Sequence, residues 1–431
     1  MKLLVKIGCI ILIILFLLIP LFSVSGISDE RQRYRSQVIS EIYNSFGKPQ
    51  ILVAPVINAD CIQIVKYFKD KEVDFKETPY KITVVPLFTE ISADMHVESK
   101  NRRIYSSAVY STTFNIKGVF NVPADIFDEQ DNQSVLIRKT YISISITDPK
   151  GIKGIPEGKI GSKPLVFDIS SEKYNTYTLN APVSIAEITG RETPFEIKLP
   201  MNGTKSLSIV PTGLESKTML TGNWPHPGFS GAFLPESREV SDAGFSATWV
   251  STWISGHIYN KMVNLHQAQQ EDYQHYSFNL DFVNLVDIYS LVNRSVKYGF
   301  LIISLTFLVI FVSEMLTKCR IHLVQYGLVG TALVLFFLLL LSLSEQIPFG
   351  AAYLTAAAAC VSLITFYIYF SLKRIGSTAL FSVSLTSLYF VLYILLNVSD
   401  YALLIGSGLI FIIIAAVMIA TRNFNWYEVS Q

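Results

Sequence analysis

Charged residues are scarce in this sequence. Asp, Glu, Lys and Arg make up 16% of its 431 residues, whereas hydrophobic residues make up 50%. Typical soluble domains contain about 25% charged residues. The 35 basic and 34 acidic residues nearly cancel, and the net charge of +1 comes without a basic block of the kind that binds nucleic acid. The shortage of charge predicts a membrane protein and argues against nucleic acid as a partner.

Cysteine is also rare. Cys9 and Cys360 fall in apolar runs, Cys319 falls in a short basic loop, and only Cys61 falls in the long polar region. A single cysteine cannot form an intrachain disulfide, and without a CxxC pair the chain has no thiolate metal site. We therefore expect no metal and no cofactor.

Long apolar runs lie near the two ends of the chain. The first, residues 7–24, follows Lys2 and Lys6. It is longer than the 7–15 apolar residues of a cleavable signal and long enough to span a bilayer. We expect an uncleaved transmembrane anchor over residues 1–27, although Val24-Ser25-Gly26 also fits a signal-peptidase site.

The second apolar region, residues 298–431, predicts five further spans. Helices are the expected spanning form, because backbone groups in lipid must be paired within their own segment. The predicted spans cover residues 298–316, 323–343, 349–372, 377–397 and 401–421.

Basic residues predict the orientation of these six spans. They occur at alternate ends of the spans: Lys2 and Lys6, Lys318 and Arg320, Lys373 and Arg374, and Arg422. The loops at 344–348 and 398–400 contain no Lys or Arg. Because basic loops stay in the cytoplasm, we expect both termini there and residues 28–297 outside.

The external region changes its hydrophobic period. Residues 28–47 have a helical pattern that ends at Gly47 and extends the first span outward. The following segments alternate apolar with polar or β-branched residues, as in KITVVPLF, SAVYSTTFNIKGVF and SVLIRKTYISISITD. About ten such strands predict an antiparallel β-sandwich or jelly-roll-like domain, either as one fold or as two lobes hinged near 150–164.

Turn residues separate the predicted strands. Asp148-Pro149-Lys150-Gly151 is typical of a turn. Asn202-Gly203 lies between FEIKLPM and TKSLSIV, and this pair predicts a β-hairpin.

Several stretches together resemble one known family. They are FGKPQILVAPVI, NWPHPGFSGAFLPESREVSDAGFSATW, VDIYSLVNRSVKYGFLIISLTFLVIFVSE, QYGLVGTALVLFFLLLLSLSE, AYLTAAAACVSLITFYIY, SDYALLIGS and VMIATRNFNWY. The chain resembles the CreD family of bacterial inner-membrane proteins over nearly its whole length, most strongly from Trp224 onward. The resemblance implies a role in cell-envelope integrity, an association with tolerance to certain colicins, and expression under a two-component response to metabolic and cell-wall stress. It implies no reaction.

The most conspicuous external motif is WPHPGFSGAFLP, residues 224–235. Two prolines fix the backbone on either side of His226, and Trp224, Phe229 and Phe233 are available for packing. The nearby acids are Glu236, Glu239 and Asp242. Without a GxSxG or HExxH pattern, we interpret Trp224, His226, Phe229 and Phe233 as a structural corner or a partner-binding surface, and catalysis is disfavoured.

Two further groups lie where the chain meets the membrane. Asp287, Tyr289, Arg294 and Lys297 precede the second span, either as an interfacial belt that contacts lipid headgroups or as a coupling site between the β-domain and the helices. Glu314 and Glu345 lie at the ends of the second and third spans. Acids at membrane depth are candidate transport residues, but water and headgroups relieve their burial at a span end.

These observations favour a non-enzymatic envelope protein that is embedded in the lipid bilayer. Its external β-domain would bind or scaffold an envelope protein or lipid partner. The alternative is a transporter or channel for a small solute or lipid that uses the C-terminal helices. An enzyme using His226 or Asp287 is a third hypothesis.

Overall fold

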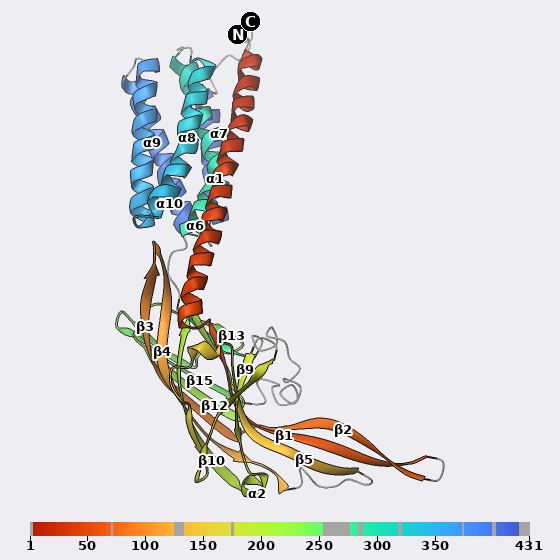
Figure 1. Ribbon diagram of the computed structural model, residues 1–431. Helices are drawn as coiled ribbons and strands as arrows, with labels where there is room; N and C mark the ends of the chain where they lie inside the picture. The colour runs from red at the N-terminus through yellow and green to blue at the C-terminus, as the bar shows by residue number, and fades with distance from the viewer. Residues whose placement is uncertain are drawn as a thin grey trace. The chain divides into compact units, whose positions relative to one another are not determined.

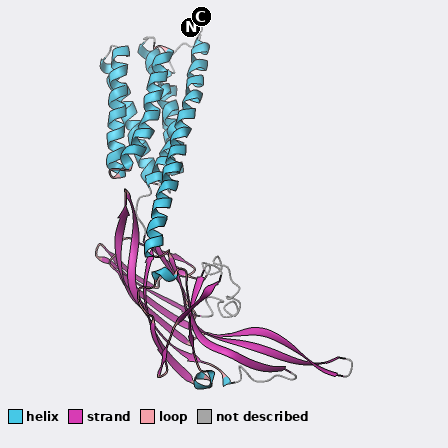
Figure 2. Ribbon diagram, in the orientation of Figure 1, coloured by secondary structure: helices cyan, strands magenta, loops and turns pink. Residues whose placement is uncertain are grey.

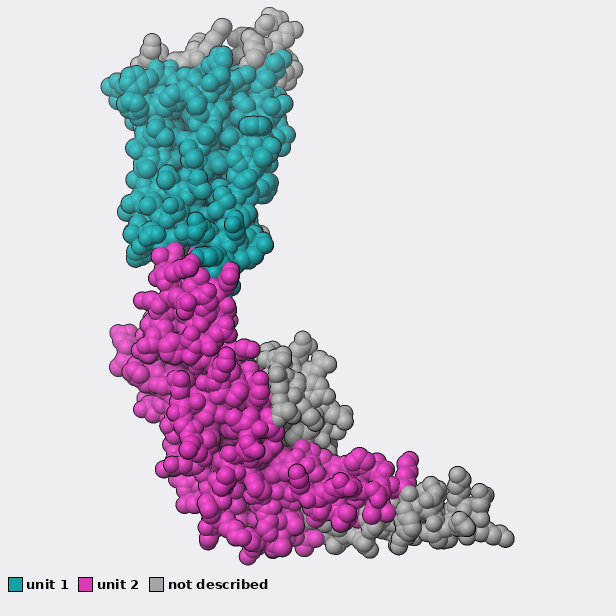
Figure 3. Space-filling view, viewed as in Figure 1, with its two compact units in different colours: residues 1–36, 286–431 teal, residues 37–285 magenta. Residues whose placement is uncertain are grey.

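The computed structural model describes residues 3–69, 72–124, 133–173, 176–252, 276–282, 288–317, 321–372, 375–398 and 402–421. The chain divides into two compact units (Figure 3): residues 1–36 with 286–431, and residues 37–285. The first unit is helical and the second consists mostly of strands (Figure 2). The domain boundaries predicted after residues 27 and 297 concern the membrane surface and stay predictions.

The helices follow the apolar runs of the sequence. Their bounds are α1 (Leu3–Phe46), α6 (Ile288–Lys297), α7 (Gly299–Thr317), α8 (Leu323–Ser344), α9 (Phe349–Leu372), α10 (Ile375–Asn397) and α11 (Ala402–Thr421). Helix α1 is uninterrupted, so the predicted outward extension of the first span is present. It ends where Gly47, with φ of +99°, donates its N–H to the Tyr43 carbonyl.

The prediction of six spans exceeds the number that the described residues support. Four helices, α1, α8, α9 and α10, are long and apolar enough to cross a membrane, and α6 with α7 counts as a fifth if the bent pair is one span. That pair bends by 43° between Lys297, where the more polar helix α6 ends, and Gly299, where the apolar α7 begins. The sixth predicted span corresponds to α11, whose side chains are described only in part.

The strand unit contains two eight-stranded sheets (Figure 1). The first contains, in order, β13 (Pro227–Gly231), β16 (Phe278–Phe282), β11 (Ser206–Val210), β1 (Gln50–Lys69), β5 (Gln133–Ile146), β9 (Thr176–Pro182) and β8 (Asp168–Lys173), with β2 (Glu72–Val84) also on β1. The second contains β14 (Ser237–Ser241), β15 (Gly244–Thr252), β12 (Glu215–Gly222), β3 (Phe88–Arg102), β4 (Tyr105–Asn121), β10 (Glu192–Thr204), β6 (Glu157–Ile160) and β7 (Lys163–Leu165). Strands β1, β2 and β5 continue as an arm beyond the rest of the two sheets (Figure 1).

One hydrophobic core joins the two sheets. Ile142 and Phe278 of the first sheet and Phe114 and Trp249 of the second belong to the same buried cluster. Strands β15 and β16 and the second half of β4 alternate buried with more exposed positions, as period-two hydrophobicity requires. This arrangement confirms the predicted sandwich, and residues 37–285 form one unit rather than two lobes.

The sheets are mixed, so the expectation of purely antiparallel pairing is wrong in two places. Strand β1 runs parallel to β11, and β12 runs parallel to β3. In both cases the paired strands are far apart in the sequence, where no hairpin imposes antiparallel pairing.

The hairpin predicted at Asn202-Gly203 is also wrong. Both residues lie inside β10, where they pair with Ser111 and Tyr110 of β4. The chain turns instead at Lys205, with φ of +62°, and passes from the second sheet to β11 in the first. Packing requires glycine here, because a Cβ on Gly203 would lie 2.3 Å from the Tyr110 hydroxyl oxygen.

Candidate functional site

The conspicuous WPHPGFSGAFLP segment lies where the chain crosses from one sheet to the other. Strand β13 is an end strand of the first sheet and β14 is an end strand of the second, among the strands that the structure describes. Trp224, Phe229 and Phe233 are partly buried against the common core. The Phe229 ring meets Trp249 edge-on at 5.7 Å between centroids. These aromatic side chains therefore hold the crossing segment against the sandwich.

His226 is not assembled into a reactive group within the described residues. Its side chain is exposed, as are Glu236, Glu239 and Asp242, and no hydrogen bond joins it to any of these acids. The described part of the chain also contains no cluster of three His, Cys, Asp or Glu side chains that could hold a metal ion. The interpretation of this segment as a corner or a binding surface stays a prediction.

Strand β16 is flanked by buried donors that the sequence did not indicate. The indole nitrogens of Trp224 and Trp249 and the hydroxyl of Tyr110 are buried without a hydrogen-bond partner. The ring centroids of Tyr110 and Trp224 lie 5.3 Å and 6.3 Å from that of Phe282 of β16. The Trp249 ring stacks on Phe278 of the same strand, with 4.6 Å between the ring centroids. Burial raises the pKa of Tyr110 above its ordinary value, which keeps the hydroxyl neutral.

Glu314 is paired inside the helical unit. Its carboxylate accepts from the Lys6 ammonium of α1 on one oxygen and, at 3.1 Å, from the Tyr326 hydroxyl of α8 on the other. Lys6 also donates to the Ile321 carbonyl at 2.9 Å. The side chains of Lys6 and Glu314 are only 13% and 10% exposed. One acid thus joins α1, α7 and α8, and this group is a buried, compensated charge pair.

Glu345 has a corresponding set of partners. It accepts a hydrogen bond from the Tyr289 hydroxyl at 3.0 Å, and its carboxylate lies 4.0 Å from the Arg31 guanidinium. The Glu345 side chain is 13% exposed. The structure therefore brings together Tyr289 and Glu345, which the sequence placed in two separate groups.

The remaining interfacial residues take part in separate contacts. Arg294 donates to the Leu396 carbonyl at the end of α10, at 3.0 Å. Its neighbour Asn293 donates to Asp29 of α1 at 2.8 Å. Lys297 is exposed, and Asp287 lies outside the described residues. Arg294 of the predicted coupling group thus ties α6 to α10, and its neighbour Asn293 ties α6 to α1, within the helical unit.

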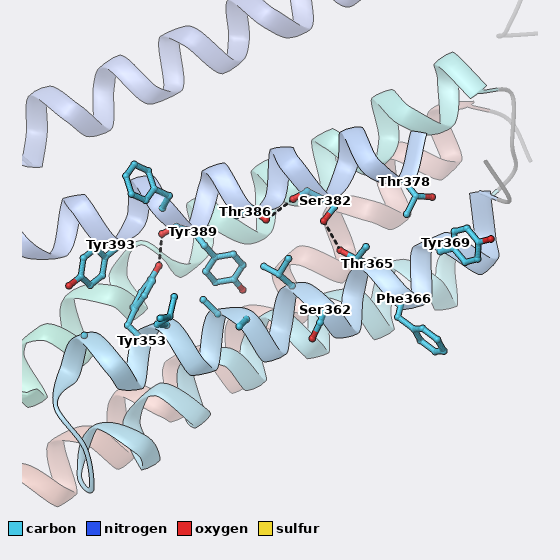
Figure 4. A pocket seen from close by; sticks show the side chains of 16 residues that line it. Tyr353, Ser362, Thr365, Phe366, Tyr369, Thr378, Ser382, Thr386, Tyr389 and Tyr393 are labelled. Carbon is cyan, nitrogen blue, oxygen red and sulfur yellow. Dashed lines mark hydrogen bonds between the residues drawn. The ribbon is translucent and has the colours of Figure 1, made fainter. Parts of the chain in front are cut away.

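A cavity in the helical unit was not anticipated from the sequence. It is a groove of about 950 Å³ between α9 and α10 (Figure 4). It is lined by carbon-rich side chains together with Ser, Thr and Tyr hydroxyls. No sequence motif indicates this groove, because it depends on the spacing of two helices whose sequences are uniformly apolar.

A helical unit with several membrane-spanning helices, joined to a large β-sandwich, defines a multi-pass membrane protein. The family described as "Inner membrane protein CreD" matches residues 2–427. The chain is 31% identical over 418 residues to Inner membrane protein CreD of Escherichia coli (strain K12), covering 97% of this chain and 92% of that protein. The chain belongs to the CreD family, which confirms the family expected from the sequence.

Proposed function

We propose that this inner-membrane protein supports cell-envelope integrity under stress by binding another envelope component through its β unit, without catalysis. The β unit would lie in the periplasm and both termini in the cytoplasm. The helical unit would serve as the anchor. The observation that carries the proposal is the pairing of both membrane-edge acids, since Glu314 and Glu345 each hold helices together. Pairing of this kind gives each acid a structural role that requires no transported solute.

Contacts within the helical unit support the proposed orientation. Lys6 reaches Ile321, next to the basic loop at 318–320, and Gln325 donates to Ser371, next to the basic pair at 373–374, at 3.0 Å. Lys6 and the described residues that flank the basic segments in the sequence thus lie at one end of this unit. By the positive-inside rule that end is cytoplasmic.

An open sheet edge supports a binding role for the β unit. All five residues of β14 are exposed, and β15 is its sole strand partner among the described strands. An unpaired edge presents backbone donors and acceptors that can accept a strand from another protein. Val240 of β14 is 50% exposed and adds an apolar side chain to this edge.

The anchoring role is tested by a double substitution in the full chain, expressed in cells that lack the gene. Glu314→Gln alone leaves the Lys6 ammonium buried without its counter-charge, and we expect a lower membrane level. Lys6→Met together with Glu314→Gln removes both charges. We then expect the level of the protein in the membrane and the survival of the cells in detergent to recover. Loss of survival in the double variant at normal membrane level would instead favour transport through the helices.

The binding role is tested at the open edge. A lysine at an edge strand blocks pairing with another strand, so Val240→Lys should lower survival in detergent at unchanged membrane level. Ser246→Lys is the matched control, because Ser246 is also exposed but is paired on both sides, with Glu239 of β14 and with Thr221 of β12. His226→Ala should retain full survival. Equal survival of the two lysine variants would refute binding at this edge, and loss with His226→Ala would restore the enzyme hypothesis.

A further inference from the structure

The groove between α9 and α10 presents mostly carbon, and several of its hydroxyls are already hydrogen-bonded within the protein. The Tyr353 hydroxyl donates to the Tyr389 carbonyl at 2.6 Å, and the Thr365 hydroxyl donates to Ser382 at 3.2 Å. Figure 4 shows both bonds among the lining side chains. Leu354 and Phe390 of the lining are 70% and 64% exposed. Because these hydroxyls are used within the protein, the groove suits a hydrocarbon better than a polar solute.

The width of the groove favours extended chains over a helix. Its lining on α9 runs from Gly350 to Tyr369, 19 residues, which at ~1.5 Å per residue is about 28 Å. Dividing the 950 Å³ by this length gives a cross-section of about 34 Å². A helix of ~10 Å diameter needs about 80 Å². Hydrocarbon chains that lie ~4 Å apart need about 16 Å² each, so the groove accommodates two.

One end of the groove carries positive charge. Arg294 donates to the Leu396 carbonyl, one turn beyond Tyr393 of the lining, and uses one of its five N–H donors there. The positive end of the α9 dipole lies at the same end, because a Cβ on Gly350 would be 3.2 Å from the Tyr393 hydroxyl oxygen. Glu345, just before α9, is already engaged by Tyr289 and Arg31.

We propose that the half of this groove next to Arg294 binds the two acyl chains of one anionic phospholipid, whose phosphate lies at the Arg294 guanidinium. A lipid tail crosses about half of the ~30 Å hydrocarbon core. That distance, ~15 Å, corresponds to about ten residues of α9 counted from Gly350, and it therefore includes Ala358. The site is independent of any partner of the β unit.

The test compares two neighbouring alanines. Ala358 is exposed and lines the groove, whereas Ala359 is exposed and does not line it. The full chain and its Ala358→Trp and Ala359→Trp variants are reconstituted in bilayers of equal phosphatidylethanolamine and phosphatidylglycerol. They are then extracted in mild detergent and examined by native mass spectrometry.

We expect one phosphatidylglycerol retained by the unsubstituted chain and by Ala359→Trp, and none retained by Ala358→Trp. Arg294→Gln can still donate to Leu396, and it should retain either phospholipid without preference. Equal lipid retention by the two tryptophan variants, or no retention by the unsubstituted chain, would overturn the proposal. A dimer that only Ala358→Trp dissociates would also overturn it, in favour of a second copy seated on the groove.

Discussion

Tyr110 combines a well-packed ring with a hydroxyl that its surroundings do not satisfy. Its ring fills the core and packs 5.3 Å from Phe282, but its hydroxyl is fully buried without a partner. The residue that faces the hydroxyl is Gly203, where a Cβ would lie only 2.3 Å from the Tyr110 hydroxyl oxygen. An unpaired buried hydroxyl loses its hydration and gains nothing in return. The ring, rather than the hydroxyl, therefore accounts for the stabilising effect of this residue.

Tyr110→Phe should raise the free energy of unfolding of the β unit by about 1 kcal/mol, because it removes an unsatisfied polar atom and keeps the ring. Tyr141→Phe is the control, since its hydroxyl donates to Asp60 at 3.1 Å. That variant should lose about 1 kcal/mol. Urea unfolding followed by tryptophan fluorescence measures both effects, because Trp224 and Trp249 belong to this unit. A loss for Tyr110→Phe as large as for Tyr141→Phe would contradict the prediction.

The same residue predicts a dependence on pH. Burial raises the pKa of Tyr110 in the folded chain above the ordinary value near 10. The unfolded chain therefore releases the hydroxyl proton first as the pH rises. The contribution of the raised Tyr110 pKa to the free energy of unfolding is therefore fully present below pH ~10, and it is lost as the pH rises above that value. The urea concentration at the unfolding midpoint should therefore fall less steeply between about pH 10 and 11 in Tyr110→Phe than in the unsubstituted chain. An equally steep fall in both would show that other groups cause the pH dependence.

At the scale of elements, close packing of α1 against the other helices is the feature most open to test. A Cβ on Gly330 of α8 would lie 2.1 Å from a Leu17 methyl carbon of α1 and 2.9 Å from the Phe307 ring of α7. A Cβ on Gly327, one turn earlier on the same helix, would meet nothing within 4 Å. Small residues that let helices approach are a common basis of packing in membranes.

Gly330→Ala should therefore push α1 away from α8 and destabilise the helical unit by about 1–3 kcal/mol through overpacking. Gly327→Ala should be neutral or slightly stabilising, because alanine is the better helix former. The melting temperature in detergent of the two purified variants measures the difference. Similar melting temperatures would mean that α1 does not pack as closely as described.

The helices and strands themselves could be predicted from the sequence more completely than the contacts between them. Period-two segments and the long apolar runs identify the strands and helices, since burial on one face or on all faces leaves a direct trace in the sequence. Asn202-Gly203 misled because the glycine is required by Tyr110 across the sheet and not by a turn. Glu314 was identified as a candidate, but its partner Lys6 lies 308 residues away, and only folding brings the two together.

At the scale of the whole molecule, the number of crossings decides where the C-terminus lies. Five crossings place it on the side opposite the N-terminus, and six place both on the same side. Helix α11 has 20 residues and contains no charged side chain, which is long and apolar enough for a bilayer. Arg422 directly after it adds the basic residue expected at a cytoplasmic end.

Green fluorescent protein fused after Gln431 should therefore be fluorescent, since this reporter folds in the cytoplasm and not after export to the periplasm. Alkaline phosphatase at the same position should be inactive. The matched fusions after residue 400, which lack α11, should show the reverse pattern, because the chain then ends after one crossing fewer. A dark green fluorescent protein and an active phosphatase after Gln431 would mean that α11 does not cross. The five crossings counted from the other helices would then be the full number, and the C-terminus would lie in the periplasm with the β unit.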